Sequence, residues 1–418
     1  MDQAVGAAVA DAHRREWAFV LAATVRVTRD LDLAEECVQD AYARALDTWG
    51  ATGIPDRPGA WLTTVARRRA LDLQRRDATA RRALPLLVTG QPEPGGETAP
   101  GPEDGAGPEI TDDRLRLVFT CCHPTLGTDA QVALSLRLLC GLSTAEVARG
   151  FLVSEPTMAA RITRAKKKIA AAGIPYRVPP ASQLPERVDA VLTVVHLLFT
   201  TGHTAPDGEA LVRRDLVERA LDLVRMLGTL LPGQPEVMGL TALILLTDAR
   251  RDARVDGDGR LVLLAGQDRN RWDPAMITEG ADLVRRALRR GRPGRFTLMA
   301  AIAAVHDEAP SFGDTDWPEI VGLYDLLMER WPSPVVALNR AVAVGFADGP
   351  AEGLAALDAL ASGPELAAYG YLSAARADFL RRLGRTADAR LAYEEALLLT
   401  GNVIERGFLA GRLADLGS

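Results

Sequence analysis

The feature that most constrains this fold is the near absence of alternating β-branched stretches long enough to form sheet strands. Ala, Leu and Arg dominate the 418-residue chain instead, and these residues lose little conformational freedom in a helix. The sequence therefore predicts an all-α protein. Its length exceeds that of one ordinary hydrophobic core and predicts roughly two to four domains.

Proline and glycine divide the chain into blocks. A Pro-, Gly- and Glu-rich stretch without helical period predicts a flexible linker over 81–110. It separates a helical block at 10–80 from a second one at 111–176. Three prolines within 173–180 then lead into a helical extension at 184–418. Near its end, Ala377, Gly384, Ala389, Tyr393 and Ala396 follow the tetratricopeptide (TPR) pattern, which predicts TPR-like repeats.

Several classes of protein are not expected. The N-terminus lacks the basic start and apolar run of a signal peptide, and no segment offers ~18 uncharged apolar residues for a membrane span. Four cysteines in a chain of this size fit a cytoplasmic protein without structural disulfides. Cys121, Cys122, His123 and Cys140 match no zinc spacing, so we expect buried thiols, no metal and no cofactor. The chain has no nucleophile elbow, P-loop or HExxH motif, so an enzyme is not expected.

The second block contains the pattern of a helix-turn-helix. Ser143 and Glu146 form a capping box, Ser154 is placed to cap the next helix, and Met158 and Ile162 share its inward face. The second helix is basic although the whole chain carries net charge -6. In a DNA major groove, the residues nearest the base edges would be Glu155, Thr157, Ala159, Ala160 and Arg161. The residues placed for phosphates would be Arg164, Lys166, Lys167 and Lys168. A solvated basic face is the alternative.

The first block pairs an acidic helix with a basic one. Over 33–46, Cys37 and Ala41 lie on a predicted buried stripe, and Glu36 and Asp40 point outward. Over 61–76 the outward face carries Arg67, Arg68, Arg69, Arg75 and Arg76. Two basic helices joined by a linker would allow the protein to contact one DNA duplex at two places.

These residues resemble an extracytoplasmic-function (ECF) sigma factor. Residues 33–46 resemble the acidic helix of its region 2, 60–76 resemble the helix that reads the −10 element, and 154–166 resemble the region 4 helix that reads the −35 element. Segments 255–272, 295–307 and 333–344 are similar to the ECF subgroup with a C-terminal TPR-containing extension.

The resemblance implies core RNA polymerase (its β′ and β subunits) and promoter DNA as partners. It implies that Glu35, Glu36, Gln39 and Asp40 bind polymerase by charge complementarity. It also implies that Arg57 and Trp61 meet a flipped −10 base, while Arg67, Arg68, Arg69, Arg75 and Arg76 hold phosphates near it. A core anchor remains the alternative for Trp61, and a solvated face is the alternative for the acidic helix.

The extension carries few signals of its own. Residues 267–272 suit ion pairs that pin helices, and the alternative is capture of a ligand carboxylate. We expect the extension to regulate the sigma factor and to replace a separate anti-sigma factor. Two other readings stay open: a TPR scaffold, or a ligand-sensing regulator that binds DNA without polymerase.

Overall fold

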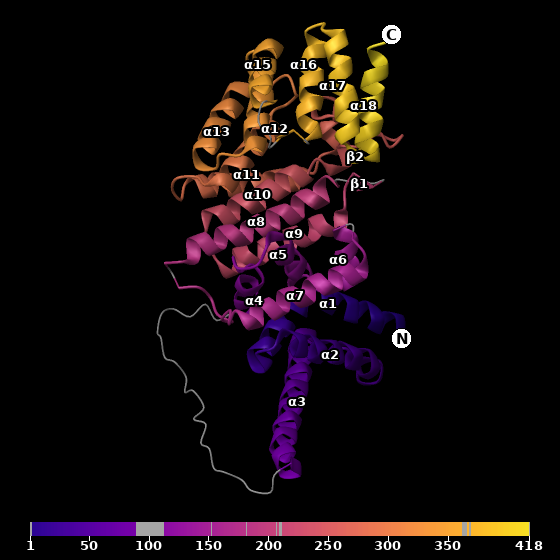
Figure 1. The fold of residues 1–418 in the computed structure, drawn as a ribbon, viewed down its shortest axis with the longest axis vertical. Helices are drawn as coiled ribbons and strands as arrows, with labels where there is room; N and C mark the ends of the chain where they lie inside the picture. Colours follow the sequence, from indigo (N-terminus) through magenta and orange to yellow (C-terminus); the bar gives the residue numbers. More distant parts are fainter. Residues whose placement is uncertain are drawn as a thin grey trace. The chain divides into compact units, whose positions relative to one another are not determined.

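A computed structural model describes residues 2–88, 113–151, 153–180, 182–205, 207–208, 211–361, 366–367 and 369–417. The chain divides into two compact units, Met1–Val194 and Val195–Ser418, and each is built almost entirely of helices (Figure 1). The predicted all-α class is confirmed. In the part of the chain that the structure describes, no helix is both long and apolar enough to cross a membrane.

The first unit begins with a three-helix bundle, α1 (Asp2–Thr28), α2 (Leu31–Thr52) and α3 (Pro58–Val88). The Asp30 carboxylate caps α2 by accepting from the backbone N–H groups of Asp32 and Leu33 at 2.8 and 2.9 Å. Trp49 and Leu62 are fully buried in this bundle. The last turns of α3 extend away from α1 and α2 (Figure 1). This helix runs past residue 81, where we predicted the linker to begin, and residues 89–112 lie outside the described residues.

The helix-turn-helix block follows in the same unit. Its elements are α4 (Asp113–Cys121), α5 (Thr128–Leu134), a π-helix η1 (Ser135–Leu139), α6 (Thr144–Gly150) and α7 (Glu155–Ala171). The capping box is confirmed, because Ser143 N donates to the Glu146 carboxylate at 2.7 Å and Glu146 N donates to Ser143 Oγ at 3.2 Å. Ser154 caps α7 with Pro156 in the first turn, and Met158 and Ile162 are buried as predicted.

The division between the units falls within α8 (Leu184–His203). The second unit continues through α9 (Arg214–Leu230), α10 (Pro235–Asp248), η2 (Arg251–Ala253), η3 (Leu264–Gly266), η4 (Arg269–Arg271), α11 (Pro274–Leu288), α12 (Arg295–Glu308), α13 (Trp317–Arg330), α14 (Pro334–Ala347), α15 (Pro350–Ala361), α16 (Gly370–Arg382), α17 (Thr386–Leu399) and α18 (Val403–Asp415). Two short strands, β1 (Asp207–Gly208) and β2 (Gly401–Asn402), pair in parallel and join the two ends of this unit.

Close helix packing organises the end of the second unit. A Cβ on Gly345 would lie 2.1 Å from the Phe379 ring, and one on Gly353 would lie 2.5 Å from the Gly345 Cα. Glycine at these positions lets α14, α15 and the Phe379 ring of α16 approach one another closely. The predicted TPR small-residue positions Ala377 and Ala389 are fully buried. The helix pairs are present, and their assignment as TPR repeats stays a prediction.

The loop at 267–272 has a structural role. The Arg269 guanidinium stacks over the Trp272 ring at 4.3 Å and donates to the His306 carbonyl at 3.0 Å. Asp268 caps η4 by accepting from Asn270 N at 3.0 Å. The segment therefore packs on α12 through a carbonyl bond and within itself through a ring contact, and in the described residues the predicted ion pairs of Asp268, Arg269 and Arg271 are not formed.

The four cysteines are free and buried, as predicted.

Candidate nucleic-acid interface

One face of α7 presents most of the residues predicted to reach DNA. Seven of them are exposed: Glu155, Thr157, Ala159, Ala160, Arg164, Lys167 and Lys168. The regular first turn that Ser154 caps places Glu155 at the free end of the helix, with the positive end of the helix dipole beside it. The exposed face therefore combines short side chains near the N-terminus, which allow close approach, with cations further along.

Arg161 is less free than its neighbours on this face. It forms an ion pair with Asp129 of α5 at 3.2 Å, and its guanidinium stacks over the Phe151 ring at 5.4 Å. The first turn of α7, which contains Pro156, is regular, and Arg161 fixes α7 against its own block.

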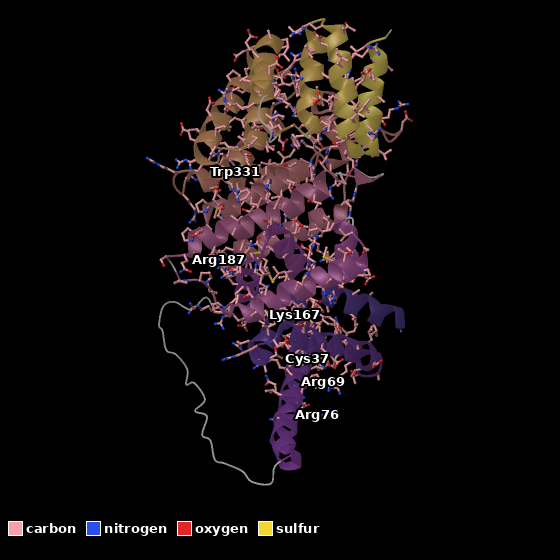
Figure 2. All side chains as sticks on the ribbon, in the orientation of Figure 1. Cys37, Arg69, Arg76, Lys167, Arg187 and Trp331 are labelled. Carbon is pink, nitrogen blue, oxygen red and sulfur yellow. The ribbon has the colours of Figure 1, made fainter. Side chains whose placement is uncertain are left out.

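The basic face of α3 is also exposed in part. Arg57, Arg67, Arg68, Arg75 and Arg76 are all accessible to solvent, and Figure 2 shows Arg76 on the extended part of α3.

Two other residues predicted to read the −10 element make contacts within the bundle. Arg69 donates to the Asp40 carboxylate of α2 at 2.9 Å. The half-buried Trp61 meets Trp49 edge-to-face, with ring centroids 5.5 Å apart. This packing favours the core-anchor alternative for Trp61, which remains partly exposed.

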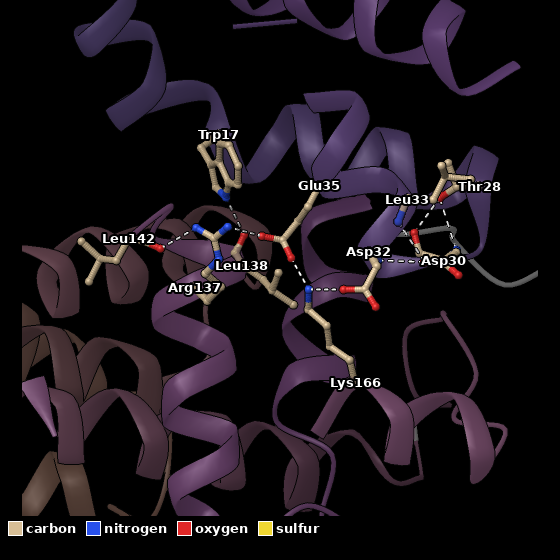
Figure 3. A network of polar contacts seen from close by, with 10 residues as sticks. All are labelled: Trp17, Thr28, Asp30, Asp32, Leu33, Glu35, Arg137, Leu138, Leu142 and Lys166. Carbon is tan, nitrogen blue, oxygen red and sulfur yellow. Dashed lines mark hydrogen bonds and ion pairs between the residues drawn. The ribbon is translucent and has the colours of Figure 1, made fainter. Parts of the chain in front are cut away.

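An ion cluster that is buried except at Asp32 joins the helix-turn-helix block to the bundle (Figure 3). Lys166 Nζ pairs with the carboxylate of Glu35 and, at 2.6 Å, with that of Asp32. Arg137 of η1 approaches the other Glu35 oxygen at 2.9 Å. The side chains of Glu35 and Lys166 are only 7% and 10% exposed, so solvent screens these charges weakly. We call these four residues the Glu35 cluster.

The Glu35 cluster changes two predictions. Glu35 was expected on a solvent face for polymerase, and Lys166 was expected on a face for DNA. Glu35 and Lys166 form an ion pair with each other instead, because a buried charge needs a partner of opposite sign. Burial acts to lower the pKa of Lys166, but Glu35 and Asp32 overcome this effect and raise it, so the lysine is charged.

Further contacts hold the same two blocks together. Trp17 Nε1 donates to the Leu138 carbonyl at 3.1 Å, and the Tyr176 hydroxyl donates to the Ala22 carbonyl at 3.0 Å. Gly141 has φ +70°, and a Cβ there would lie 2.9 Å from both His13 and Trp17. The contact is thus a fitted interface made of apolar, hydrogen-bonded and ionic parts.

What remains exposed on α2 is a smaller acidic face. Glu36 and Gln39 are exposed, and Asp40 is half-exposed while it pairs with Arg69. Sequence reasoning missed Asp32, Arg137 and Trp17 as contributors to the site. A signal for Glu35 was available, because Val38 and Tyr42, at i+3 and i+7, are apolar positions on the same side of the helix.

Comparison with known proteins agrees with this architecture. Residues 13–80 match the model for Sigma-70 region 2, and residues 116–169 match that for Sigma-70, region 4. The chain thus carries two segments that match sigma-70 regions, in the order region 2 and then region 4. Its sigma regions therefore correspond to the bundle and to the helix-turn-helix block. Residues 187–288 match a family of unknown function, DUF6596.

Two relatives extend the comparison. An uncharacterized protein of Rhizobium meliloti (strain 1021) is 43% identical over 398 residues, which cover 95% of this chain and 93% of that protein. The probable ECF RNA polymerase sigma factor SigI of Mycobacterium tuberculosis (strain H37Rv) is 28% identical over 173 residues, or 41% of this chain and 58% of its own. No solved structure matches the chain.

Proposed function

We propose that this protein binds core RNA polymerase and directs promoter-specific transcription initiation. In this proposal the bundle reads the −10 element and the helix-turn-helix block reads the −35 element. The observation that carries the proposal is the capped α7 with its exposed basic face, in the same chain as the exposed arginines of α3. The order of the two matched sigma regions supports it.

The DNA contacts divide into two groups. Lys167 and Lys168 are exposed and suit phosphates, whereas Glu155 and Thr157 suit base edges at the N-terminal end of α7. Lys166 joins the DNA face only when its ion pairs with Glu35 and Asp32 open.

The polymerase contact is proposed for the exposed acidic face of α2. Glu36 and Gln39 are its accessible members, and Asp40 takes part through its half-exposed carboxylate. Charge complementarity with a basic polymerase surface would set encounter rate and register.

In vitro transcription with core polymerase tests this function. Glu36→Lys should abolish polymerase association and promoter-dependent transcription, because it places a cation on the acidic face without touching the Arg69–Asp40 pair. Asp47→Lys, at another exposed acidic position of α2, is the matched control and should retain activity. Retained association in Glu36→Lys would contradict the proposed face, and DNA binding by the native protein without polymerase association would favour a ligand-sensing regulator.

The second unit is proposed to regulate the sigma regions and to take the place of a separate anti-sigma factor. Its helix pairs α14–α15 and α16–α17 support a TPR-like end to the extension. A chain ending after Arg177 tests regulation by comparing its promoter-specific transcription with that of the whole protein. Truncation after Arg177 also removes Arg187, which donates to the Phe119 carbonyl in the first unit. Full-length Arg187→Ala is therefore the control, because it loses this contact and keeps the extension. Equal activity and regulation of the two chains would refute the proposal.

A further inference from the structure

The second unit contains a cavity of about 950 Å³. It is lined by the end of α8, by the segment from Arg254 to Gln267, and by residues of α14, α16, α17 and α18. Its volume lies at the upper end of the range for small-molecule sites, roughly 300–1,000 Å³. Asn402 Nδ2 donates to the Ala205 carbonyl at 3.0 Å and holds the first and last of these walls together.

Aromatic rings form much of the cavity wall. Phe346 and Phe379 lie edge-to-face with centroids 6.2 Å apart, and Tyr369 and Tyr371 lie 5.2 Å apart. Rings held in this way offer a large apolar surface at a low cost in side-chain entropy. Such walls fit a flat, apolar ligand body.

Arg254 supplies a cation at one end of the cavity. Its guanidinium donates to the His203 carbonyl and, at 3.1 Å, to Thr204 Oγ1, both of which are neutral. Within the described residues, no carboxylate oxygen forms an ion pair with it. Burial and then the neighbouring Arg250 lower its pKa to about 10, against the opposing effect of the Glu405 carboxylate, so Arg254 is charged near neutral pH.

The acidic groups of the cavity have partners of their own. Glu405 accepts from the Tyr371 hydroxyl at 2.7 Å, and Asp378 pairs with Arg381 at 2.7 Å. Arg412, the other cavity cation, stacks over the Phe408 ring at 5.2 Å. The hydrogen-bond acceptors of Arg254 are both neutral, so an incoming anion would give its guanidinium a charged partner.

We propose that this cavity binds a small organic anion with a flat apolar body, whose carboxylate or sulfonate group pairs with Arg254. The apolar body lies against the aromatic wall, and the anion completes the coordination of the guanidinium. Binding of such an anion does not depend on whether the extension regulates transcription.

The test compares two fluorescent probes on the full-length protein. Anilinonaphthalene sulfonate carries the anion, and N-phenylnaphthylamine is the same skeleton without it. Arg254→Gln should weaken binding of the sulfonate about tenfold or more and change binding of the neutral probe less than about twofold, since only the ion pair is removed. Arg225→Gln, in an exposed pair with Glu279 outside the cavity, should change neither.

Two further measurements guard against a folding defect in Arg254→Gln. Val342→Trp fills the cavity and should weaken both probes, while Arg254→Lys keeps the charge and should retain most sulfonate affinity. On the native protein, naphthalene carboxylate should displace the sulfonate at a lower concentration than naphthalene methanol does. Equal displacement by the two competitors, or probe binding unchanged by both Arg254→Gln and Val342→Trp, would overturn the proposal.

Discussion

Replacing Glu35 with glutamine should release the helix-turn-helix block from the bundle. The substitution keeps the side-chain volume and removes the one charge that faces both Lys166 and Arg137. These cations are only 10% and 16% exposed, so they would stay partly buried with less compensation. Loss of docking relieves that cost by returning both side chains to water.

The magnitude follows from the geometry. Two unit charges at the 2.9 Å Arg137–Glu35 separation attract by about 6 kcal/mol at an effective dielectric constant of ~20. Two contacts reduce the net loss: Asp32 still pairs with Lys166, and Arg137 still donates to the Leu142 carbonyl at 2.8 Å. Breaking one partner of a buried pair costs ~3–5 kcal/mol, so we expect about 3 kcal/mol here, or roughly a hundredfold shift in the docking equilibrium.

Spin labels on Arg44→Cys and Ala170→Cys would measure that equilibrium, because both positions are exposed and lie on α2 and α7. The native cysteines are buried, and burial raises the pKa of Cys37 and Cys122 to about 11, which keeps these thiols unreactive toward the label. The native chain should give one short distance by double electron–electron resonance, and Glu35→Gln should add longer ones.

Asp40→Asn is the matched control for Glu35→Gln. It removes another α2 carboxylate, which pairs with Arg69 within the bundle. Because the Asp40 side chain is 46% exposed, the change in docking free energy should stay below about 1 kcal/mol. A distance distribution unchanged in Glu35→Gln would refute the role given to the Glu35 cluster.

Three other perturbations follow from the packing. Met158→Ala, at a fully buried position, should lower the free energy of unfolding of the first unit by about 2–5 kcal/mol, measured by urea titration. A loss under about 1 kcal/mol would contradict the packing of α7. Gly141→Ala should shift the labels apart as Glu35→Gln does, because φ +70° and the contact with Trp17 both oppose a Cβ; an unchanged distance would show that the contact adapts. Burial, together with neighbouring arginines, lowers the pKa of both His196 and His306 to about 4. Their stabilisation is therefore complete above the unfolded pKa near 6.5 and is lost as pH falls toward 4. Each should contribute a slope near 1.4 kcal/mol per pH unit in that window, measured by urea unfolding. The pair His196→Asn and His306→Asn should reduce the slope by the sum of these two contributions and leave that of His203, whose pKa burial also lowers; an unchanged slope would contradict this origin.

The parts of the fold that depend on neighbours in sequence could be predicted. The caps at Ser143 and Ser154 and the buried face of Met158 and Ile162 depend on residues three or four positions away, where helical periodicity is reliable. The exposed cations Lys167 and Lys168 follow from the same periodicity. The candidate DNA face was therefore largely readable from the sequence.

The Glu35 cluster could not be predicted in the same way. Lys166 and Glu35 are 131 residues apart, and nothing in either local pattern names the other as a partner. The π-helix at Ser135–Leu139 also depends on tertiary context, and it places both Arg137 and the Leu138 carbonyl against the bundle. Glu35 and Glu36 look equally solvated in the sequence of α2. Only the elements that pack against the helix decide which of the two is buried.

The pairing of β1 with β2 has a consequence for the order in which the protein is made. Asn402, in β2, bonds to a carbonyl 197 residues earlier, so the second unit cannot close until nearly the whole chain has left the ribosome. At a synthesis rate of ~5–20 residues per second, the two sigma regions, which end with α7 at Ala171, emerge roughly 12–46 s before that closure. Each new molecule thus passes through a period in which its two sigma regions exist without a completed extension.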